Sequence, residues 1–372
     1  NGGKIFALAL TGASIVLINY DILAKWKDQI IKFAPKLIIC DEAHRLKNLN
    51  GSKGSQRAVA AKEISKKCKT MLMSGTPVVN RPIELYSLLN IIDPAAWGNR
   101  WNFLQRFCDP KNNGFGWDFS GASNLDELHE KIKPWVVRHL KKDVLTELPE
   151  KRYSPVIFQL GKKAKADYDA VVSGAKQAIK NSLAAKKPAN ALAEIERLKQ
   201  AAAVAKLPAC IEWINDFIET GEKLVVFATH KFVIDALMAE YGNIAVKVDG
   251  SVTGEERQKS VDRFQNDESV KLFVGNIQAA GVGITLTASS NVAFIEFAWG
   301  PSEMSQSSDR VHRIGQKNAV TIFYLAGENT IDEKIVELLE SKRQIVDQIH
   351  DGKIGDMDLN IFSELVKRLL TD

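Results

Sequence analysis

A run of four apolar residues that leads directly into two carboxylates constrains the fold of this chain most strongly. Residues 37–40 read Leu-Ile-Ile-Cys, and Asp41 and Glu42 follow without a break. An apolar run without alternation is typical of a strand that is buried on both faces of a parallel sheet. Ligands of such sheets bind beyond the carboxyl ends of the strands, so we expect both carboxylates to lie at a ligand-binding edge.

Asp41 and Glu42 together suit the hydrolysis half of a nucleotide-binding site, the Walker B element. An aspartate at this edge can hold Mg²⁺, and a neighbouring glutamate can orient and deprotonate a water molecule. The tetrapeptide DEAH at 41–44 is weak evidence when taken alone, because a buried strand can also end in an exposed acidic turn. The rest of the chain has to decide between these two interpretations.

Strand-like and helix-like segments alternate in two series along the chain. The first series contains expected strands at 14–21, 37–41 and 70–73, and the second begins near Pro208 and ends with an amphipathic helix over 331–349. This pattern predicts two doubly wound α/β domains with parallel sheets. We expect a first lobe at 1–92, an insertion with a basic linker at 93–207, a second lobe at 208–350 and a tail helix at 351–372.

The expected insertion has an unusual composition in two places. Four of the seven tryptophans lie between residues 93 and 135, which predicts a small aromatic core and leaves base stacking as the alternative. Residues 162–206 carry ten Lys or Arg against four Asp or Glu. We expect two projecting helices there, broken at Pro188, which could contact a polyanion or form an ordinary solvated basic face.

The overall composition excludes several other classes of protein. The 372 residues carry a net charge of only +5, and no apolar run is long enough to span a membrane. The four cysteines lie far apart, without a CxxC pair or a Cys/His cluster, which argues against a zinc site or a disulfide framework. Cysteines of this kind fit a reducing, intracellular compartment.

Two arginines far along the chain can complement the two carboxylates. Arg310 and Arg313 stand three residues apart in a segment that we expect to be helical from Met304 to Arg313, so they would share one helical face. Arginine can stabilise the charge that develops on a γ-phosphate during its transfer. Alone, the segment would be interpreted as a basic surface helix. Its pairing with an Asp-Glu motif on another sheet favours a catalytic role that would depend on domain closure.

Five motifs together resemble those of the Swi/Snf-like branch of the superfamily-two helicase-like ATPases. They are DEAH at 41–44, SGTP at 74–77, DGS at 249–251, AGVG at 280–283 and DRVHRIGQ at 309–316, and they span nearly the whole chain. The stretch GWDFSGASN at 116–124 is similar to the HARP-type annealing helicases, which remodel forks. The resemblance implies two RecA-like lobes with helical insertions. It also implies a monomeric, ATP-driven motor that moves along double-stranded or forked DNA, in the nucleus or on the nucleoid.

The resemblance also implies roles for individual residues, with ATP and Mg²⁺ as cofactors. Asp41 would coordinate Mg²⁺, Glu42 would activate water, and Arg310 and Arg313 would be arginine fingers. Support for the ATP site would come from His44, Gly283, Gln306 and Gln316, and coupling to the DNA groove from Ser74, Gly75 and Thr76. The DNA backbone would be contacted by His230, Lys231, Asp249, Gly250, Ser251 and Gly281, while Trp299 could grip a strand or pack in the core.

One motif of the family is missing from the chain. No GxxxxGK[ST] loop occurs among the 372 residues, and the family places this loop upstream of the strand at 37–40. We therefore expect that an upstream part of the first lobe, from the same protein or a separate chain, is required. Alone, the chain should hydrolyse ATP very slowly or not at all. Two alternatives stay open: a nucleosome-remodelling motor with the same engine, and a non-catalytic DNA-binding fragment.

Overall fold

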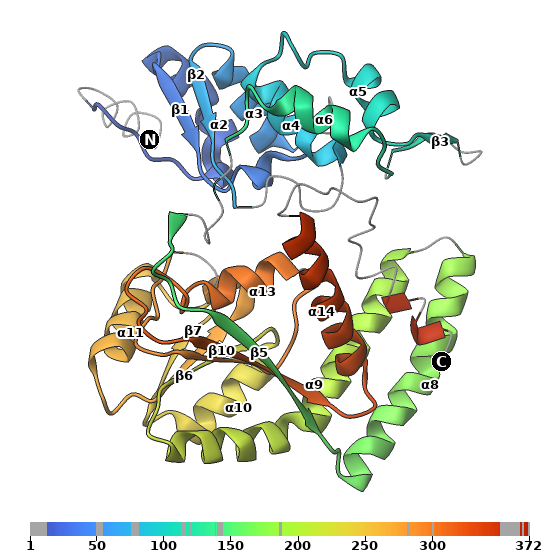
Figure 1. The fold of residues 1–372 in the computed structure, drawn as a ribbon, viewed down its shortest axis with the longest axis vertical. Helices are drawn as coiled ribbons and strands as arrows, with labels where there is room; N and C mark the ends of the chain where they lie inside the picture. Colours follow the sequence, from blue (N-terminus) through green and yellow to red (C-terminus); the bar gives the residue numbers. More distant parts are fainter. Residues whose placement is uncertain are drawn as a thin grey trace. The chain divides into compact units, whose positions relative to one another are not determined.

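The computed structural model describes most of the chain and divides it into two compact units (Figure 1). The described residues are 13–49, 55–75, 82–112, 117–119, 121–137, 139, 144–185, 188–280, 283–299, 301–349, 365–366 and 368–370. The first unit comprises residues 1–138 with 354–358, and the second comprises residues 139–353 with 359–372.

The first unit contains the expected pair of parallel strands. Strand β1 (Leu37–Cys40) pairs in parallel with β2 (Lys69–Leu72), so the prediction of neighbouring strands with their carboxyl ends at one edge is confirmed. Helices α2 (Tyr20–Phe33), α3 (Gln56–Ser65) and α4 (Pro82–Ile92) contribute to the core beside this sheet.

The other face of this two-stranded sheet is not covered by described residues. Leu37, Ile39 and Met71 are 49%, 54% and 50% exposed, whereas Cys40 at the end of β1 is buried. The prediction that β1 is buried on both faces is therefore wrong for the part of the chain that the structure describes, because the helices pack on one face only.

The strand predicted at 14–21 is also wrong, because a helix begins within it. The side chain of Asn19 accepts a hydrogen bond of 3.0 Å from the backbone N–H of Asp21, so Asn19 caps α2 at its first turn. Leu23, Trp26 and Ile30 then recur at helical spacing and are buried. Residues 14–19 precede the helix and form no strand, and Ile15 and Leu17 are 81% and 92% exposed.

The rest of the first unit is the predicted aromatic region, which packs against α4. It contains α5 (Arg100–Phe107), α6 (Leu125–Ile132) and an antiparallel pair of short strands, β3 (Lys111–Asn112) and β4 (Trp117–Asp118). Trp97 makes edge contacts with Phe103 at 6.0 Å and Trp135 at 5.6 Å between ring centroids, which confirms a small aromatic core for two of the four tryptophans. The other two, Trp101 and Trp117, are 44% and 51% exposed. Leu85 and Tyr86 of α4 share this core, so the expected boundary at 92/93 does not separate compact units.

The second unit is built on a parallel six-stranded sheet in the order β5-β10-β9-β6-β8-β7. The strands are β5 (Lys151–Phe158), β6 (Leu224–Ala228), β7 (Ala245–Val248), β8 (Leu272–Asn276), β9 (Asn291–Phe294) and β10 (Val320–Gly327). Five of these strands were expected from the sequence, and the doubly wound α/β fold is confirmed. Strand β5 was not expected, because it lies in the segment predicted to be a linker. It pairs with β10 along its whole length.

Helices cover both faces of this sheet (Figure 1). They are α8 (Lys162–Ala184), α9 (Pro188–Glu219), α10 (Lys231–Tyr241), α11 (Gly254–Asn266), α12 (Ile277–Ala280), α13 (Pro301–Ser308) and α14 (Ile331–Ile349). Alternate residues of β6 enter different cores: Val225 and Phe227 contact one, and Leu224, Val226 and Ala228 the other. Among the described residues, no helix combines the length and the apolar character needed to cross a membrane.

Helix α9 packs on β5 and β10 of the sheet, and α8 packs against α9, so the two long helices do not simply project from the lobe. The predicted break at Pro188 is confirmed, but α9 continues through Pro208, so the expected domain boundary at 207/208 falls inside a helix. Ile179 of α8 and Ile195 of α9 are buried in the same core as Phe227. The described residues of the expected tail also join this core, through Leu365, Val366 and Leu369.

Candidate functional site

Asp41 and Glu42 lie where β1 ends and the chain turns away from the sheet. The Oδ1 atom of Asp41 accepts a hydrogen bond of 2.9 Å from the backbone N–H of Glu42, and Tyr20 donates its hydroxyl to the Asp41 carbonyl at 2.7 Å. Glu42 adopts a left-handed backbone with φ 47°, and the next residue, Ala43, donates to the Met73 carbonyl at 2.8 Å. The carboxylates are thus held at the carboxyl edge of β1, as expected.

His44 connects the first strand to the second at this edge. It lies in η1 (Ala43–Leu46), and its Nδ1 atom is 3.2 Å from Ser74 Oγ and 3.2 Å from Glu42 Oε2. The structure therefore brings three of the predicted site residues together, namely Glu42 and His44 from DEAH and Ser74 from SGTP. Gly75 follows directly, whereas Thr76 lies outside the described residues.

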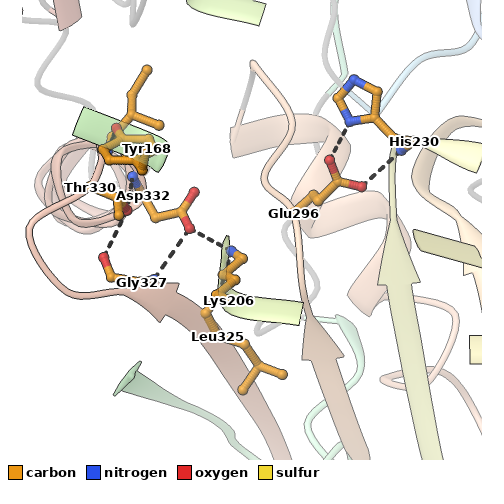
Figure 2. Close-up of polar contacts among 9 residues, drawn as sticks. Tyr168, Lys206, His230, Glu296, Leu325, Gly327, Thr330 and Asp332 are labelled. Atoms are coloured by element: carbon orange, nitrogen blue, oxygen red, sulfur yellow. Dashed lines mark hydrogen bonds and ion pairs between the residues drawn. The ribbon is translucent and has the colours of Figure 1, made fainter. Parts of the chain in front are cut away.

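His230 forms an ion pair with a carboxylate that the sequence analysis missed (Figure 2). Glu296 follows β9, is 3% exposed, and accepts hydrogen bonds from the backbone N–H groups of Thr229 and His230 at 2.9 and 2.8 Å. Its other oxygen contacts His230 Nδ1. This hydrogen bond raises the pKa of His230 above its ordinary value. Burial acts to raise the pKa of Glu296, but the His230 side chain and the two backbone donors hold it below its ordinary value.

The expected DNA-contacting turn after β7 is closed by its own aspartate. Asp249 Oδ1 accepts hydrogen bonds from the backbone N–H of Ser251 at 2.9 Å and from its hydroxyl at 2.5 Å, and Asp249 Oδ2 pairs with Lys247 at 3.2 Å. Burial acts to raise the pKa of Asp249, yet these partners hold it below the ordinary value. Asp249 shapes the turn, and a Cβ on Gly250 would meet open space. Lys231, the first residue of α10, is exposed, and Gly281 lies outside the described residues.

Arg310 and Arg313 do not share a helical face, which corrects the prediction. Helix α13 ends at Ser308, and the arginines lie in the turns that follow. Both turns are held against residues 284–286, immediately after Gly283, which has φ 72°. The Arg310 carbonyl accepts from Leu286 N at 2.8 Å, and Arg313 donates its Nη1–H to the Ile284 carbonyl at 3.3 Å.

The arginine turns are anchored to the start of β5 by residues that the sequence analysis missed. Lys151 donates to Asp309 Oδ1 at 2.6 Å and to Ser308 Oγ at 3.2 Å, and His312 Nε2 donates to the Pro149 carbonyl at 2.6 Å. These contacts could not be found from the motif, because β5 itself was interpreted as a linker. They fix the motif DRVHRIGQ to the first strand of the second lobe.

The two predicted glutamines of this motif differ in their surroundings. Gln316 is 7% exposed and donates its amide to the Ser289 carbonyl at 2.7 Å, while its Oε1 atom accepts from the N–H groups of Lys317 and Asn318. Gln316 therefore holds the end of the motif DRVHRIGQ against the segment that precedes β9. Gln306 is half-buried on α13.

Two known protein families match consecutive parts of the chain. The family of the SNF2-related domain matches residues 5–206, and the Helicase conserved C-terminal domain matches residues 205–315. The chain belongs to the SNF2-related family. The predicted Swi/Snf-like resemblance and the RecA-like α/β fold are therefore confirmed.

Relatives of this SNF2-related chain include annealing helicases. The SWI/SNF-related matrix-associated actin-dependent regulator of chromatin subfamily A-like protein 1 of Xenopus laevis is 36% identical over 343 residues, which are 90% of this chain and 35% of the relative. The DNA annealing helicase and endonuclease ZRANB3 of Homo sapiens is 32% identical over 86% of this chain and 30% of its own length. The chain thus spans about a third of the length of these curated relatives.

A solved structure also resembles the SNF2-related chain. The Sulfolobus solfataricus SWI2/SNF2 ATPase core in complex with dsDNA is 25% identical, with a TM-score of 0.48 over 94% of this chain and 75% of that one.

A buried ion pair joins α9 to α14 in the second lobe of the SNF2-related chain (Figure 2). Lys206 of α9 is fully buried and donates to Asp332 Oδ2 at 2.6 Å and to the Leu325 carbonyl at 2.7 Å. Tyr168 Oη accepts from the backbone N–H of Ile331 at 2.8 Å. Lys206 belongs to the basic segment 162–206, so its burial removes it from any surface that could contact a polyanion.

Proposed function

We propose that this chain is the motor of an ATP-driven double-stranded DNA translocase that remodels or anneals branched DNA such as forks. The observation that carries this proposal is the arrangement at the carboxyl edge of β1. There, Asp41 and Glu42 are held by backbone contacts, and His44 lies 3.2 Å from both Glu42 and Ser74. Family membership supports DNA-dependent ATP hydrolysis, and similarity to an annealing helicase supports branched DNA as the substrate.

The donor chemistry at this edge fits Mg²⁺. Magnesium prefers oxygen ligands and is commonly held by one or two carboxylates together with phosphate oxygens and water. Asp41 would supply that carboxylate, and the ion would neutralise negative charge on the phosphates of ATP. No further ligand from the described residues is needed for such a site.

Each of the chain's own residues then has a defined task. Glu42 orients the attacking water and takes its proton, and Arg310 and Arg313 stabilise negative charge on the phosphate that is transferred. His44 contacts both Glu42 and Ser74, so a change at the nucleotide is transmitted to the loop that follows β2. His230, Lys231, the 249–251 turn and Trp299 contact the DNA, independently of its sequence and in a salt-sensitive manner.

The phosphate-binding loop is supplied from outside these 372 residues, by an upstream segment or by a separate chain. The absence of GxxxxGK[ST] from the sequence supports this part of the proposal. The half-exposed apolar side chains of Leu37, Ile39 and Met71 also support it, because further strands or helices of the first lobe would cover them. The complete motor acts as a monomer and is associated with DNA, in the nucleus if the source is eukaryotic.

The test is ATP hydrolysis by the chain together with the segment that carries a GK[ST] loop, without DNA, with duplex DNA and with forked DNA. Strong stimulation by DNA that is lost in Glu42→Gln would support the motor. Preference for the fork over the linear duplex would support the annealing subgroup, and preference for nucleosomes would favour a nucleosome-remodelling motor. No stimulation while DNA binding is intact would instead favour a non-catalytic DNA-binding fragment.

A further inference from the structure

Trp299 is held at two points by charged residues of α9. Its indole N–H donates to Glu196 Oε1, and the ammonium group of Lys199 lies 4.5 Å from the centroid of the ring. Lys199 and Glu196 in turn approach each other, with 3.6 Å between Nζ and Oε2. Each of the three side chains therefore contacts the other two.

The burial of Lys199 shows that this arrangement is specific. Its side chain is only 5% exposed, and a buried ammonium group is costly unless nearby groups compensate its charge. A carboxylate and the face of a tryptophan are both suitable partners, and tryptophan is the aromatic residue that attracts cations most strongly. Simple apolar packing of the indole would require neither charge, so the pair does more than fill space.

The position of Trp299 places this arrangement at the functional edge of the second lobe. Trp299 follows β9 by a few residues, and His230 follows the neighbouring strand β6. Both strands run in parallel, so both side chains belong to the carboxyl edge of the sheet. The charges of Glu196 and Lys199 also act on His230, where Glu196 raises its pKa and Lys199 lowers it, after the larger effect of Glu296. The same turn of α9 thus faces both predicted DNA contacts.

We propose that Glu196 and Lys199 are positioning residues that hold the indole of Trp299 in the orientation that contacts DNA. The helix α9 thereby becomes a structural support of the DNA-binding edge and connects it to α8, against which α9 packs. This inference rests on the proposed function, in which Trp299 touches DNA.

A positioning role and a purely electrostatic role of Glu196 predict opposite changes in DNA affinity for the variant Glu196→Ala. Glu196→Ala removes a negative charge, so if charge alone mattered the affinity for DNA would rise. If Glu196 positions the indole, the affinity falls, by about 3-fold, because the ring loses its anchor. Glu196→Gln also removes the charge but keeps an oxygen that can accept from the indole N–H, so its affinity should not fall. The matched control is Glu194→Ala, which removes the same charge two residues earlier, where the partner is Arg197.

The experiment is fluorescence anisotropy of a labelled DNA duplex at one fixed low salt concentration. The duplex is titrated with the chain together with the segment that carries a GK[ST] loop, and with variants of that protein. Trp299→Ala should weaken binding by about 5-fold or more, because the duplex loses its contact with the buried apolar surface of the indole. The double variant Glu196→Ala/Trp299→Ala should bind like Trp299→Ala alone, because the two changes remove one interaction. Trp299→Phe keeps a ring but cannot donate to Glu196, so it tests the anchor even if Glu196→Ala folds poorly.

Different results would contradict the positioning role of Glu196, the DNA contact of Trp299 or the proposed function. An affinity of Glu196→Ala that equals or exceeds that of Glu194→Ala, or wild-type binding by Trp299→Phe, would overturn the positioning role. Wild-type binding by Trp299→Ala would overturn it as well, and would remove Trp299 from the DNA contacts while leaving the motor intact. If the unaltered protein, complete with its GK[ST] segment, bound no duplex at all, the proposed function itself would fail.

Discussion

The two lobes use the same sequence pattern in opposite ways. In the first lobe an apolar strand ends in Asp41 and Glu42, and in the second the apolar strand β9 leads to Glu296. Asp41 is exposed and Glu42 is partly exposed, whereas Glu296 is 3% exposed and accepts hydrogen bonds from two backbone donors and from His230. In the first lobe the pattern leaves the carboxylates accessible, whereas in the second lobe Glu296 holds the loop that follows β6.

The difference lies in the neighbouring strands. Beside β1 the described neighbour is β2, which is followed by Ser74 and Gly75, small residues that leave room at the edge. Beside β9 lies β6, whose following residues Thr229 and His230 turn their N–H groups toward Glu296. A carboxylate after a buried strand is therefore a candidate for catalysis only if the adjacent loop does not already occupy its oxygens.

The largest expected effect is on ATP hydrolysis, which should depend on the carboxylate of Glu42. Glu42→Gln should lower DNA-stimulated ATP hydrolysis by at least about 100-fold, the range in which general base catalysis contributes. Its free energy of unfolding should change by no more than about 0.5 kcal/mol, because Glu42 is partly exposed. Steady-state turnover and urea unfolding of the protein with its phosphate loop measure both quantities. Near-normal turnover would remove Glu42 from the catalytic site.

The opposite result is expected for Glu296. Glu296→Ala should lower the free energy of unfolding by about 2–3 kcal/mol, because it leaves the His230 side chain and two partly buried N–H groups without their acceptor. Urea unfolding of the 372-residue chain measures the loss, with the exposed Glu268→Ala as a matched control that should change little. If both variants unfold alike, Glu296 has no structural role and the comparison between the lobes fails.

A smaller effect is expected at the anchor of the arginine turns. Lys151→Met should lower kcat for ATP by about 10-fold, since loss of the contact to Asp309 misplaces the turns that carry Arg310 and Arg313. The KM for ATP should change little, and Lys151→Arg should restore part of kcat, because it keeps the charge. Exposed Lys163 of α8 provides a control, as Lys163→Met removes the same charge elsewhere. An equal loss in both variants would show a general charge effect.

The smallest expected effect is a dependence of stability on pH. The folded pKa of His230 is raised by Glu296, so the pair stabilises the fold fully below the ordinary histidine pKa of 6.5. This contribution is lost as the pH rises through the folded pKa. Urea unfolding between about pH 5 and 9 should therefore show a difference between wild type and His230→Asn that shrinks with rising pH, by under about 1 kcal/mol. The exposed His129→Asn serves as a control. A difference that grows with pH would contradict the ion pair.

Most strands of the second lobe could be predicted because each is a short apolar run with a polar turn after it. Strand β5 escaped prediction, since Lys151 to Phe158 alternates and includes a proline, as suits a strand at the sheet edge. The helix over 304–313 was predicted too long. After Ser308 the chain is held by long-range contacts from Lys151 and Leu286, which local sequence does not reveal.

The sequence by itself determined the α/β class, the pairing of β1 with β2, the break at Pro188 and the family, because these depend on local periodicity and on short motifs. Only the tertiary structure decided that Glu296 forms an ion pair with His230, that Lys206 is buried against Asp332 and that Glu196 of α9 accepts a hydrogen bond from Trp299. Each of these facts joins residues more than 60 positions apart. The role of a charged side chain depends on which partners the fold brings to it, and composition along the chain does not contain that information.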